Sequence, residues 1–128
     1  MAKKVLIVDD SPTERHILEQ IMAEAGYNVI TAASGEEGVA KVKSEHPDIV
    51  LMDVVMPGMN GYQATREIAK TPETSHIPVI ICTSRGADTD KLWGMRQGAQ
   101  EYLVKPITKQ TLLPKVQKAL ANAPEKNS

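Results

Sequence analysis

The clearest strand-then-helix unit of the chain is Val5-Leu6-Ile7-Val8-Asp9-Asp10-Ser11-Pro12-Thr13-Glu14. Its first four residues form a continuous aliphatic run, which is typical of a strand that is covered on both faces. Ser11 then offers a helix cap, with Pro12 at the first helical position and Glu14 at the third. A strand that passes directly into a capped helix predicts a parallel βαβ arrangement.

The same alternation recurs along the rest of the chain. Apolar runs begin at residues 5, 29, 49, 79 and 102, which leaves room for a crossover helix between neighbours and too much chain for a hairpin. We therefore expect the α/β class, with a single doubly wound five-stranded parallel sheet and five helices. The helices should begin near Ser11, Ser34, Gly61, Asp88 and Thr108.

Two of these helices need closer attention. In the helix capped by Asp88, helical spacing predicts that Leu92, Met95 and Ala99 face the core. In the last helix, Pro114 would cost about 3 kcal/mol if it lay in the helix interior. We therefore expect Thr111 to be the effective cap, which would put Pro114 in the first turn.

Length and composition predict one globular domain, residues 1–122, followed by a flexible tail at 123–128. The 128 residues include 41% hydrophobic and 24% charged side chains, with a net charge of −1 and only 3% aromatics. These values argue against nucleic-acid binding. No apolar stretch approaches the roughly 20 residues that span a bilayer, so no membrane insertion is expected. With Cys82 as the lone cysteine and no leader pattern, we expect a cytoplasmic monomer.

Polar side chains follow four of the predicted strands, where parallel sheets bind their ligands. They are Asp9 and Asp10, Asp53, Thr83, and Lys105 before Pro106. Taken singly, the acidic residues could be only helix-start or turn residues, and Thr83 and Lys105 ordinary strand-end residues. Together, three carboxylates at neutral pH need a cation or raised pKa values, and an oxygen-only set with room for water suits Mg²⁺. The ion would offset charge on a phosphoryl group that Lys105 and Thr83 also contact.

The chain resembles the receiver domains of response regulators, the CheY-like superfamily. The resemblance is carried by residues 5–11, 51–61, 77–84 and 98–106, and extends from Lys4 to about Ala121. It implies a flavodoxin-like fold with strand order 2-1-3-4-5. A narrower similarity, carried by residues 10–14, 63–66 and 89–98, is to the PilH-like stand-alone receivers of type IV pilus chemosensory systems, which govern twitching motility.

The resemblance also implies roles for individual residues. Asp53 would accept the phosphoryl group. Asp10, Asp53 and the backbone carbonyl of Val55 would bind Mg²⁺, with Asp9 assisting through water. Lys105 would pair with the phosphate, aimed by a cis bond to Pro106.

A second implied set transmits the signal. Thr83 and Tyr102 would form the switch pair, with Tyr102 swinging inward as Thr83 moves toward the phosphate. A histidine kinase, expected to be of the CheA type, would donate the phosphoryl group. The output protein would bind the face made by the fourth helix, fifth strand and fifth helix. Trp93 lies beside, and not on, the expected inner stripe of the fourth helix, so we expect it to be partly exposed near that face, with a tryptophan at the edge of the core as the alternative.

The function predicted is therefore a phosphorylated switch rather than an enzyme with conventional substrate turnover. A phosphate sink without its own output and a receiver-like interaction module that takes no phosphate remain alternatives. A phosphohydrolase of the haloacid dehalogenase type is disfavoured, because it needs a second aspartate where this chain has Val55. A DNA-binding regulator is not expected, since the length leaves no room for a second domain.

Overall fold

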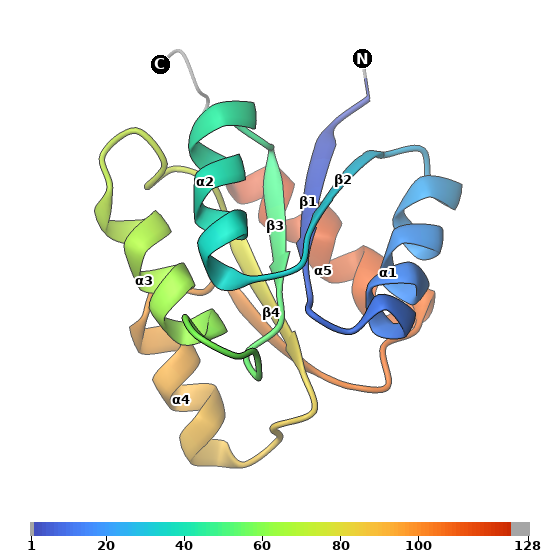
Figure 1. Cartoon of the computed structure of the whole chain (residues 1–128). Coiled ribbons are helices and arrows are strands. Elements are labelled where there is room, and N and C mark those ends of the chain that lie inside the picture. Colours follow the sequence, from blue (N-terminus) through green and yellow to red (C-terminus); the bar gives the residue numbers. More distant parts are fainter. Residues whose placement is uncertain (1, 124–128) are drawn as a thin grey trace.

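The computed structural model describes residues 2–123, which contain a parallel sheet in the order β2-β1-β3-β4-β5 (Figure 1). The strands are β1 (Lys4–Val8), β2 (Asn28–Ala32), β3 (Ile49–Met52), β4 (Val79–Thr83) and β5 (Glu101–Val104). The helices are α1 (Pro12–Glu24), α2 (Gly35–Glu45), α3 (Gly61–Lys70), α4 (Asp88–Arg96) and α5 (Lys109–Asn122). The predicted fold class and strand order are confirmed. Residues 124–128 of the predicted tail lie outside the described residues.

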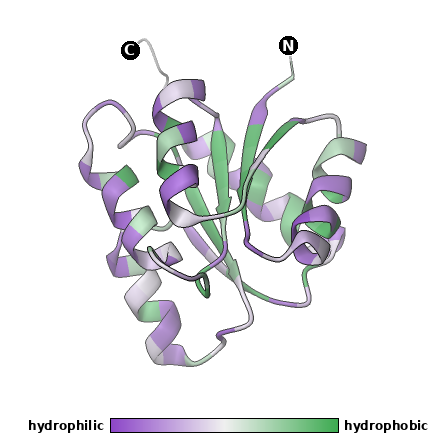
Figure 2. Ribbon diagram, in the orientation of Figure 1, coloured by the Kyte–Doolittle hydropathy of each residue, from purple (hydrophilic) through white to green (hydrophobic). Residues whose placement is uncertain are grey.

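The alternation of side chains along the strands divides the core between the two faces of the sheet. Val5 and Ile7 of β1 lie in a buried cluster with residues of α1 and α5, whereas Leu6 and Val8 lie in a cluster with residues of α2 and α3. The central strands are accordingly apolar on both faces and the outer helix surfaces are polar (Figure 2). Cys82 of β4 is fully buried in the first cluster, and burial raises the pKa of its thiol to about 12.

Helix caps behave as the sequence predicts at the first two helices. The Ser11 hydroxyl accepts a hydrogen bond from the Glu14 amide at 3.3 Å, and the Ser34 hydroxyl accepts one from the Glu37 amide at 3.1 Å. Each bond satisfies an amide that the first helical turn leaves without a partner. Among residues 2–123, no helix is long and apolar enough to cross a membrane.

The prediction for α4 was wrong in its cap and in two residues of its buried face, Leu92 and Met95, whereas the predicted burial of Ala99 is confirmed. Ala87, not Asp88, holds the cap position, and no side chain caps the helix there. Leu92 and Met95 are 55% and 44% exposed, whereas Gly94 and Ala99 are buried. The reason is the close approach of α4 to the sheet, because a Cβ on Gly94 would lie 2.8 Å from the Tyr102 ring.

The prediction for the start of α5 was also wrong. Thr108 is the cap, and its hydroxyl and that of Thr111 exchange hydrogen bonds with each other's backbone amides. Pro114 therefore lies inside the helix, past its first turn. Its ring is exposed, and burial of Leu112 and Val116 on the other side fixes the helix against the sheet. Tertiary packing thus outweighs the intrinsic cost of an internal proline.

Replacing Pro114 by alanine should stabilise the protein. The alanine restores an amide that can donate to the carbonyl of Gln110, and it removes the clash of the proline ring. We expect the free energy of unfolding to rise by about 1–3 kcal/mol, measured by urea denaturation. Gln117→Ala, at an exposed position of the same helix, serves as a control and should change stability by less than about 0.5 kcal/mol. A Pro114→Ala protein no more stable than the wild type would contradict this account.

Candidate functional site

Three carboxylates meet at the carboxyl edge of the sheet. Asp9 and Asp10 follow β1 and Asp53 follows β3, two strands paired in the register Val8↔Met52. One carboxylate oxygen from each of the three lies within 4.8 Å of the others. Asp9 and Asp53 are buried, while Asp10 is exposed. The sequence-predicted acidic cluster is therefore present, and it lies at the strand ends.

Asp9 is the most constrained of the three. Its Oδ1 accepts a hydrogen bond from the Ser11 amide at 2.9 Å, and its Oδ2 lies 2.8 Å from the Lys105 ammonium. The Arg15 guanidinium donates to its backbone carbonyl, also at 2.8 Å. The start of α1 and the end of β5 therefore hold this carboxylate in one orientation. Sequence reasoning missed Arg15, which carries no motif signal beyond its place in the first turns of α1.

Lys105 is the cation of the site. Besides its 2.8 Å contact with Asp9, its Nζ lies 3.8 Å from an Asp53 oxygen and 3.8 Å from a Glu14 oxygen. Burial disfavours the ammonium, but the Asp9 hydrogen bond and the charges of Asp53, Asp9 and Glu14 outweigh it, so the pKa of Lys105 is raised. The side chain is therefore charged at neutral pH. The peptide bond between Lys105 and Pro106 is cis, as the sequence predicts.

The surroundings of Asp53 make its carboxyl group harder to ionise than that of an ordinary aspartate. Burial, reinforced by the charges of Asp9 and Asp10, raises the pKa of Asp53 from its ordinary 3.8 to about 6, although Lys105 and a backbone hydrogen bond act in the opposite direction. One lysine thus does not fully compensate three neighbouring carboxylates. The site carries excess negative charge that a hard divalent cation would relieve.

The loop after Asp53 lies close to that residue because of a glycine. At the start of α3, a Cβ on Gly61 would lie only 1.9 Å from the Asp53 carbonyl oxygen, so no larger residue fits without moving the backbone. Val55, in the same loop, has a 54% exposed side chain. The role predicted for its carbonyl stays a prediction.

Thr83 and Tyr102 lie near the same edge on β4 and β5. Thr83 is fully buried, and its carbonyl accepts from the Lys105 amide at 2.8 Å. The ring of Tyr102 is half-buried and packs against Val54 and Ile81, an orientation that we call inward, and its hydroxyl donates to the Arg85 carbonyl at 2.7 Å. Burial, followed by the hydrogen bond shared with the Tyr62 hydroxyl, raises the pKa of the Tyr102 phenol. Sequence reasoning missed Tyr62, whose only signal is an aromatic residue in the first turn of a helix.

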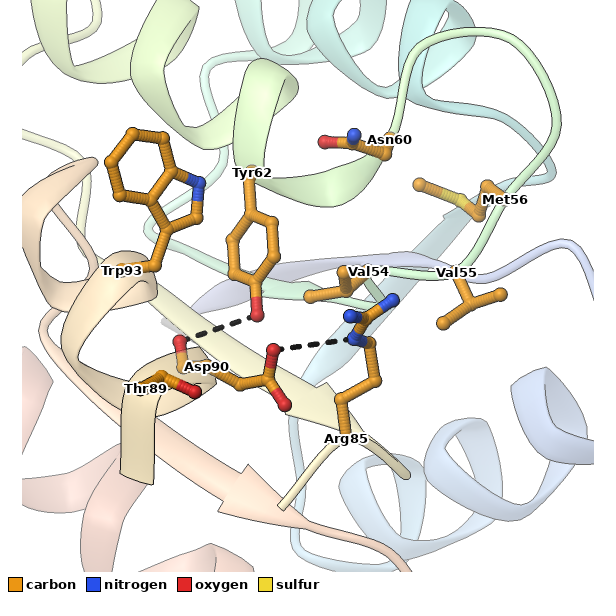
Figure 3. Close-up of a pocket in the computed structure, with 9 residues that line it drawn as sticks. All are labelled: Val54, Val55, Met56, Asn60, Tyr62, Arg85, Thr89, Asp90 and Trp93. Atoms are coloured by element: carbon orange, nitrogen blue, oxygen red, sulfur yellow. Dashed lines mark hydrogen bonds and ion pairs between the residues drawn. The ribbon is translucent and has the colours of Figure 1, made fainter. Parts of the chain in front are cut away.

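A cavity of about 480 Å³ lies between the loop after Asp53 and the helices α3 and α4 (Figure 3). Its wall includes Val54 and Val55, which follow Asp53 directly, and Tyr62 and Trp93 from the two helices. Trp93 is 49% exposed, as predicted from its place beside the expected inner stripe. The cavity is therefore continuous with the loop that carries the candidate acceptor.

Comparisons with known proteins agree on one family. The model of the response regulator receiver domain matches residues 5–117. Protein PilH of Pseudomonas aeruginosa is 52% identical over 118 residues, which cover 92% of this chain and 98% of that protein. The predicted resemblance to receivers, and to the PilH-like group among them, is confirmed.

Two solved structures are similar throughout. Chemotaxis protein CheY4 of Vibrio cholerae has a TM-score of 0.87 at 34% identity, covering 93% of this chain and 99% of that one. A chain of the CheX–CheY–BeF3–Mg²⁺ complex from Borrelia burgdorferi has a TM-score of 0.85 at 34% identity, covering 91% and 87%.

The raised pKa of Asp53 predicts a pH-dependent effect of Asp53→Asn on the metal-free protein. Because the folded carboxyl titrates near 6 and the unfolded one near 3.8, the folded state is penalised fully above about pH 6 and not at all below about pH 4. Asp53→Asn should therefore raise the free energy of unfolding by about 1–3 kcal/mol at pH 7.5, and the gain should vanish toward pH 4.

Urea denaturation in the presence of a chelator measures this difference at each pH. Asp88→Asn is the control, because it removes an exposed carboxylate outside the cluster and should give no gain at any pH. A gain for Asp53→Asn that is independent of pH, or a loss at pH 7.5, would refute the electrostatic account.

Proposed function

The chain belongs to the family of response-regulator receiver domains, and from this premise we propose that it is a phosphorylation-driven signalling switch with Asp53 as acceptor. The observation that carries the proposal is the placement of Lys105 between Asp9 and Asp53, at 2.8 and 3.8 Å, beside the acidic cluster. A cation held at that point can contact a phosphoryl group attached to Asp53.

The acceptor step is a displacement at phosphorus. An oxygen of the Asp53 carboxylate attacks the phosphorus of a phosphohistidine on a partner kinase, the P–N bond breaks, and the histidine nitrogen leaves. Lys105 orients the phosphoryl oxygens and opposes their charge, while the Thr83 hydroxyl donates to one of them. Positioning and electrostatics supply most of the rate in such transfers. Water later hydrolyses the acyl phosphate, which resets the switch.

Mg²⁺ fits the residues that are present. Three carboxylates within 4.8 Å give an oxygen-only ligand set, and burial, together with the charges of Asp9 and Asp10, raises the pKa of Asp53. Asp10 and Asp53, with the Val55 carbonyl, would hold the ion, and Asp9 would assist through water. When bound, the ion supplies positive charge to a transferring phosphoryl group.

Output is proposed to pass through Thr83 and Tyr102 to the face of α4, β5 and α5. Two of these elements carry exposed apolar side chains, namely Leu92, Trp93 and Met95 on α4 and Val104 on β5. Apolar side chains grouped on a surface are typical of a protein-binding site. A partner protein that docks there would sense any change in Tyr102, whose ring contacts α4 at Gly94.

We further propose that the donor is a CheA-type chemosensory kinase and that the pathway controls type IV pilus motility in the cytoplasm. The support is the 52% identity to PilH over almost the full length of both chains. A phosphate sink without output would use the same chemistry at Asp53. Two observations would identify a phosphate sink. The phosphoryl label of a partner regulator would be lost to this chain, and no protein would bind the α4–β5–α5 face.

Asp53→Asn should abolish phosphorylation. The wild type, incubated with Mg²⁺ and radiolabelled acetyl phosphate, should gain an acid-stable, alkali-labile label, and the variant should gain none because the amide is not a nucleophile for phosphorus. Asp88→Asn, which leaves the cluster intact, should label like the wild type. Persistent labelling of Asp53→Asn would remove Asp53 as the acceptor, and an unlabelled wild type would favour the interaction-module alternative.

Removal of Mg²⁺, or of a residue that binds it, should affect phosphorylation through loss of the metal and not through loss of the acceptor. Chelation should stop labelling of the wild type, and Asp10→Asn should weaken Mg²⁺ binding at least about ten-fold in isothermal titration calorimetry. The control is Glu36→Gln, which changes an exposed acid outside the cluster. Unchanged Mg²⁺ affinity in Asp10→Asn would exclude that residue as a ligand.

A further inference from the structure

Two tyrosines from separate parts of the chain share a hydrogen bond beside the site. The hydroxyl of Tyr62, in the first turn of α3, lies 3.0 Å from the hydroxyl of Tyr102 on β5. The two rings pack in one small cluster with Val54, which follows Asp53, and with Ile81 of β4. Tyr62 therefore connects the helix after the candidate acceptor loop to the aromatic member of the proposed switch pair.

The protons of this pair can be assigned from the surrounding acceptors. Tyr102 donates its single hydroxyl proton to the Arg85 carbonyl at 2.7 Å. In the bond between the two hydroxyls, Tyr62 must then be the donor and the Tyr102 oxygen the acceptor. The Asp90 carbonyl, 3.2 Å away, is a second acceptor for the same Tyr62 proton, as Figure 3 shows. The Arg85 carbonyl belongs to the loop that leads into α4, and the Asp90 carbonyl belongs to the first turn of α4, so both lie in one segment at the start of this helix. The two hydroxyls thus hold Tyr102 and this segment together.

The same segment is braced by an ion pair, and the ring is restrained by close packing. The Arg85 guanidinium lies 3.4 Å from the Asp90 carboxylate, which joins the two carbonyl-bearing residues. On the other side, Gly94 of α4 is so close that a Cβ there would lie 2.8 Å from the Tyr102 ring. The Tyr102 ring has little freedom to move while its hydroxyl is hydrogen-bonded. The contact with Tyr62 therefore helps to keep Tyr102 in its inward orientation.

We propose that Tyr62 is a positioning residue of the switch, which stabilises Tyr102 in its inward orientation through the hydroxyl–hydroxyl contact. The inference rests on the proposed function, in which inward Tyr102 accompanies a phosphoryl group on Asp53. A group that stabilises the phosphoryl-competent orientation raises the affinity of the site for a phosphoryl mimic in proportion to the increase in the fraction of molecules that have this orientation. It has no such effect on Mg²⁺ binding alone.

Tyr62→Phe tests this inference, because it removes one hydroxyl and keeps the ring. With saturating Mg²⁺, beryllofluoride should bind about three- to ten-fold more weakly than to the wild type, the range expected for the loss of one hydrogen bond. Mg²⁺ affinity measured without beryllofluoride should be unchanged. Trp93 is the chain's single tryptophan and lines the same cavity as Tyr62, so its fluorescence provides the titration signal. Thermal denaturation confirms that the variant is folded.

A double-mutant cycle with Tyr102→Phe separates positioning from general destabilisation. Adding Tyr62→Phe to Tyr102→Phe should cause no further loss of beryllofluoride affinity, because the contact is already absent. Tyr27→Phe, which changes the remaining tyrosine on the α1 side of the sheet, should bind beryllofluoride like the wild type. Losses that add in the double variant, or equal losses of Mg²⁺ and beryllofluoride affinity in Tyr62→Phe, would overturn the inference.

The failure of this inference is distinguishable from failure of the proposed function. Beryllofluoride binding by the wild type with unchanged affinity in Tyr62→Phe would overturn the role of Tyr62 and leave the receiver function standing. A wild type that binds Mg²⁺ but no beryllofluoride would overturn both.

Discussion

Mutual repulsion among three carboxylates is the constraint on which the site depends. Asp9, Asp10 and Asp53 are brought within 4.8 Å because β1 and β3 are parallel neighbours whose ends share one edge of the sheet. Lys105 relieves part of this repulsion, while burial, together with the charges of Asp9 and Asp10, keeps the pKa of Asp53 raised. The fold therefore keeps the site in an unfavourable electrostatic state that added positive charge improves.

Several features of the surrounding structure act to maintain that arrangement. Gly61 lets the first residue of α3 lie against the backbone of Asp53, and the Ser11 amide and Lys105 fix Asp9 from two elements. At the other end of the region, Gly94 lets α4 lie against Tyr102. Small residues at these two contacts place the acceptor loop and the switch aromatic within one packed cluster. A change at one can thus reach the other through direct contacts.

The sequence predicts most of what lies at strand ends and little of what lies between helices. Runs of aliphatic residues identify the strands, and the polar residues after them, such as Asp53 and Lys105, are placed by the topology of a parallel sheet. The buried face of α4 was mispredicted because Leu92 and Met95 follow helical spacing, whereas contact with the sheet is made through Gly94. Helical periodicity locates a buried face from apolar side chains, so it cannot identify a face that packs closely because it has a glycine. Pro114 and Tyr62 likewise take their roles from tertiary packing.

The deep burial of Cys82 has a practical consequence for studying this molecule. A thiol with a pKa near 12 is almost wholly protonated at neutral pH, and no part of this residue is open to solvent. Because maleimide and iodoacetamide reagents react with the thiolate, Cys82 does not react with them in the folded protein. A second cysteine engineered onto the outer surface of α4 would then accept a spin label or dye selectively, without removing the natural one.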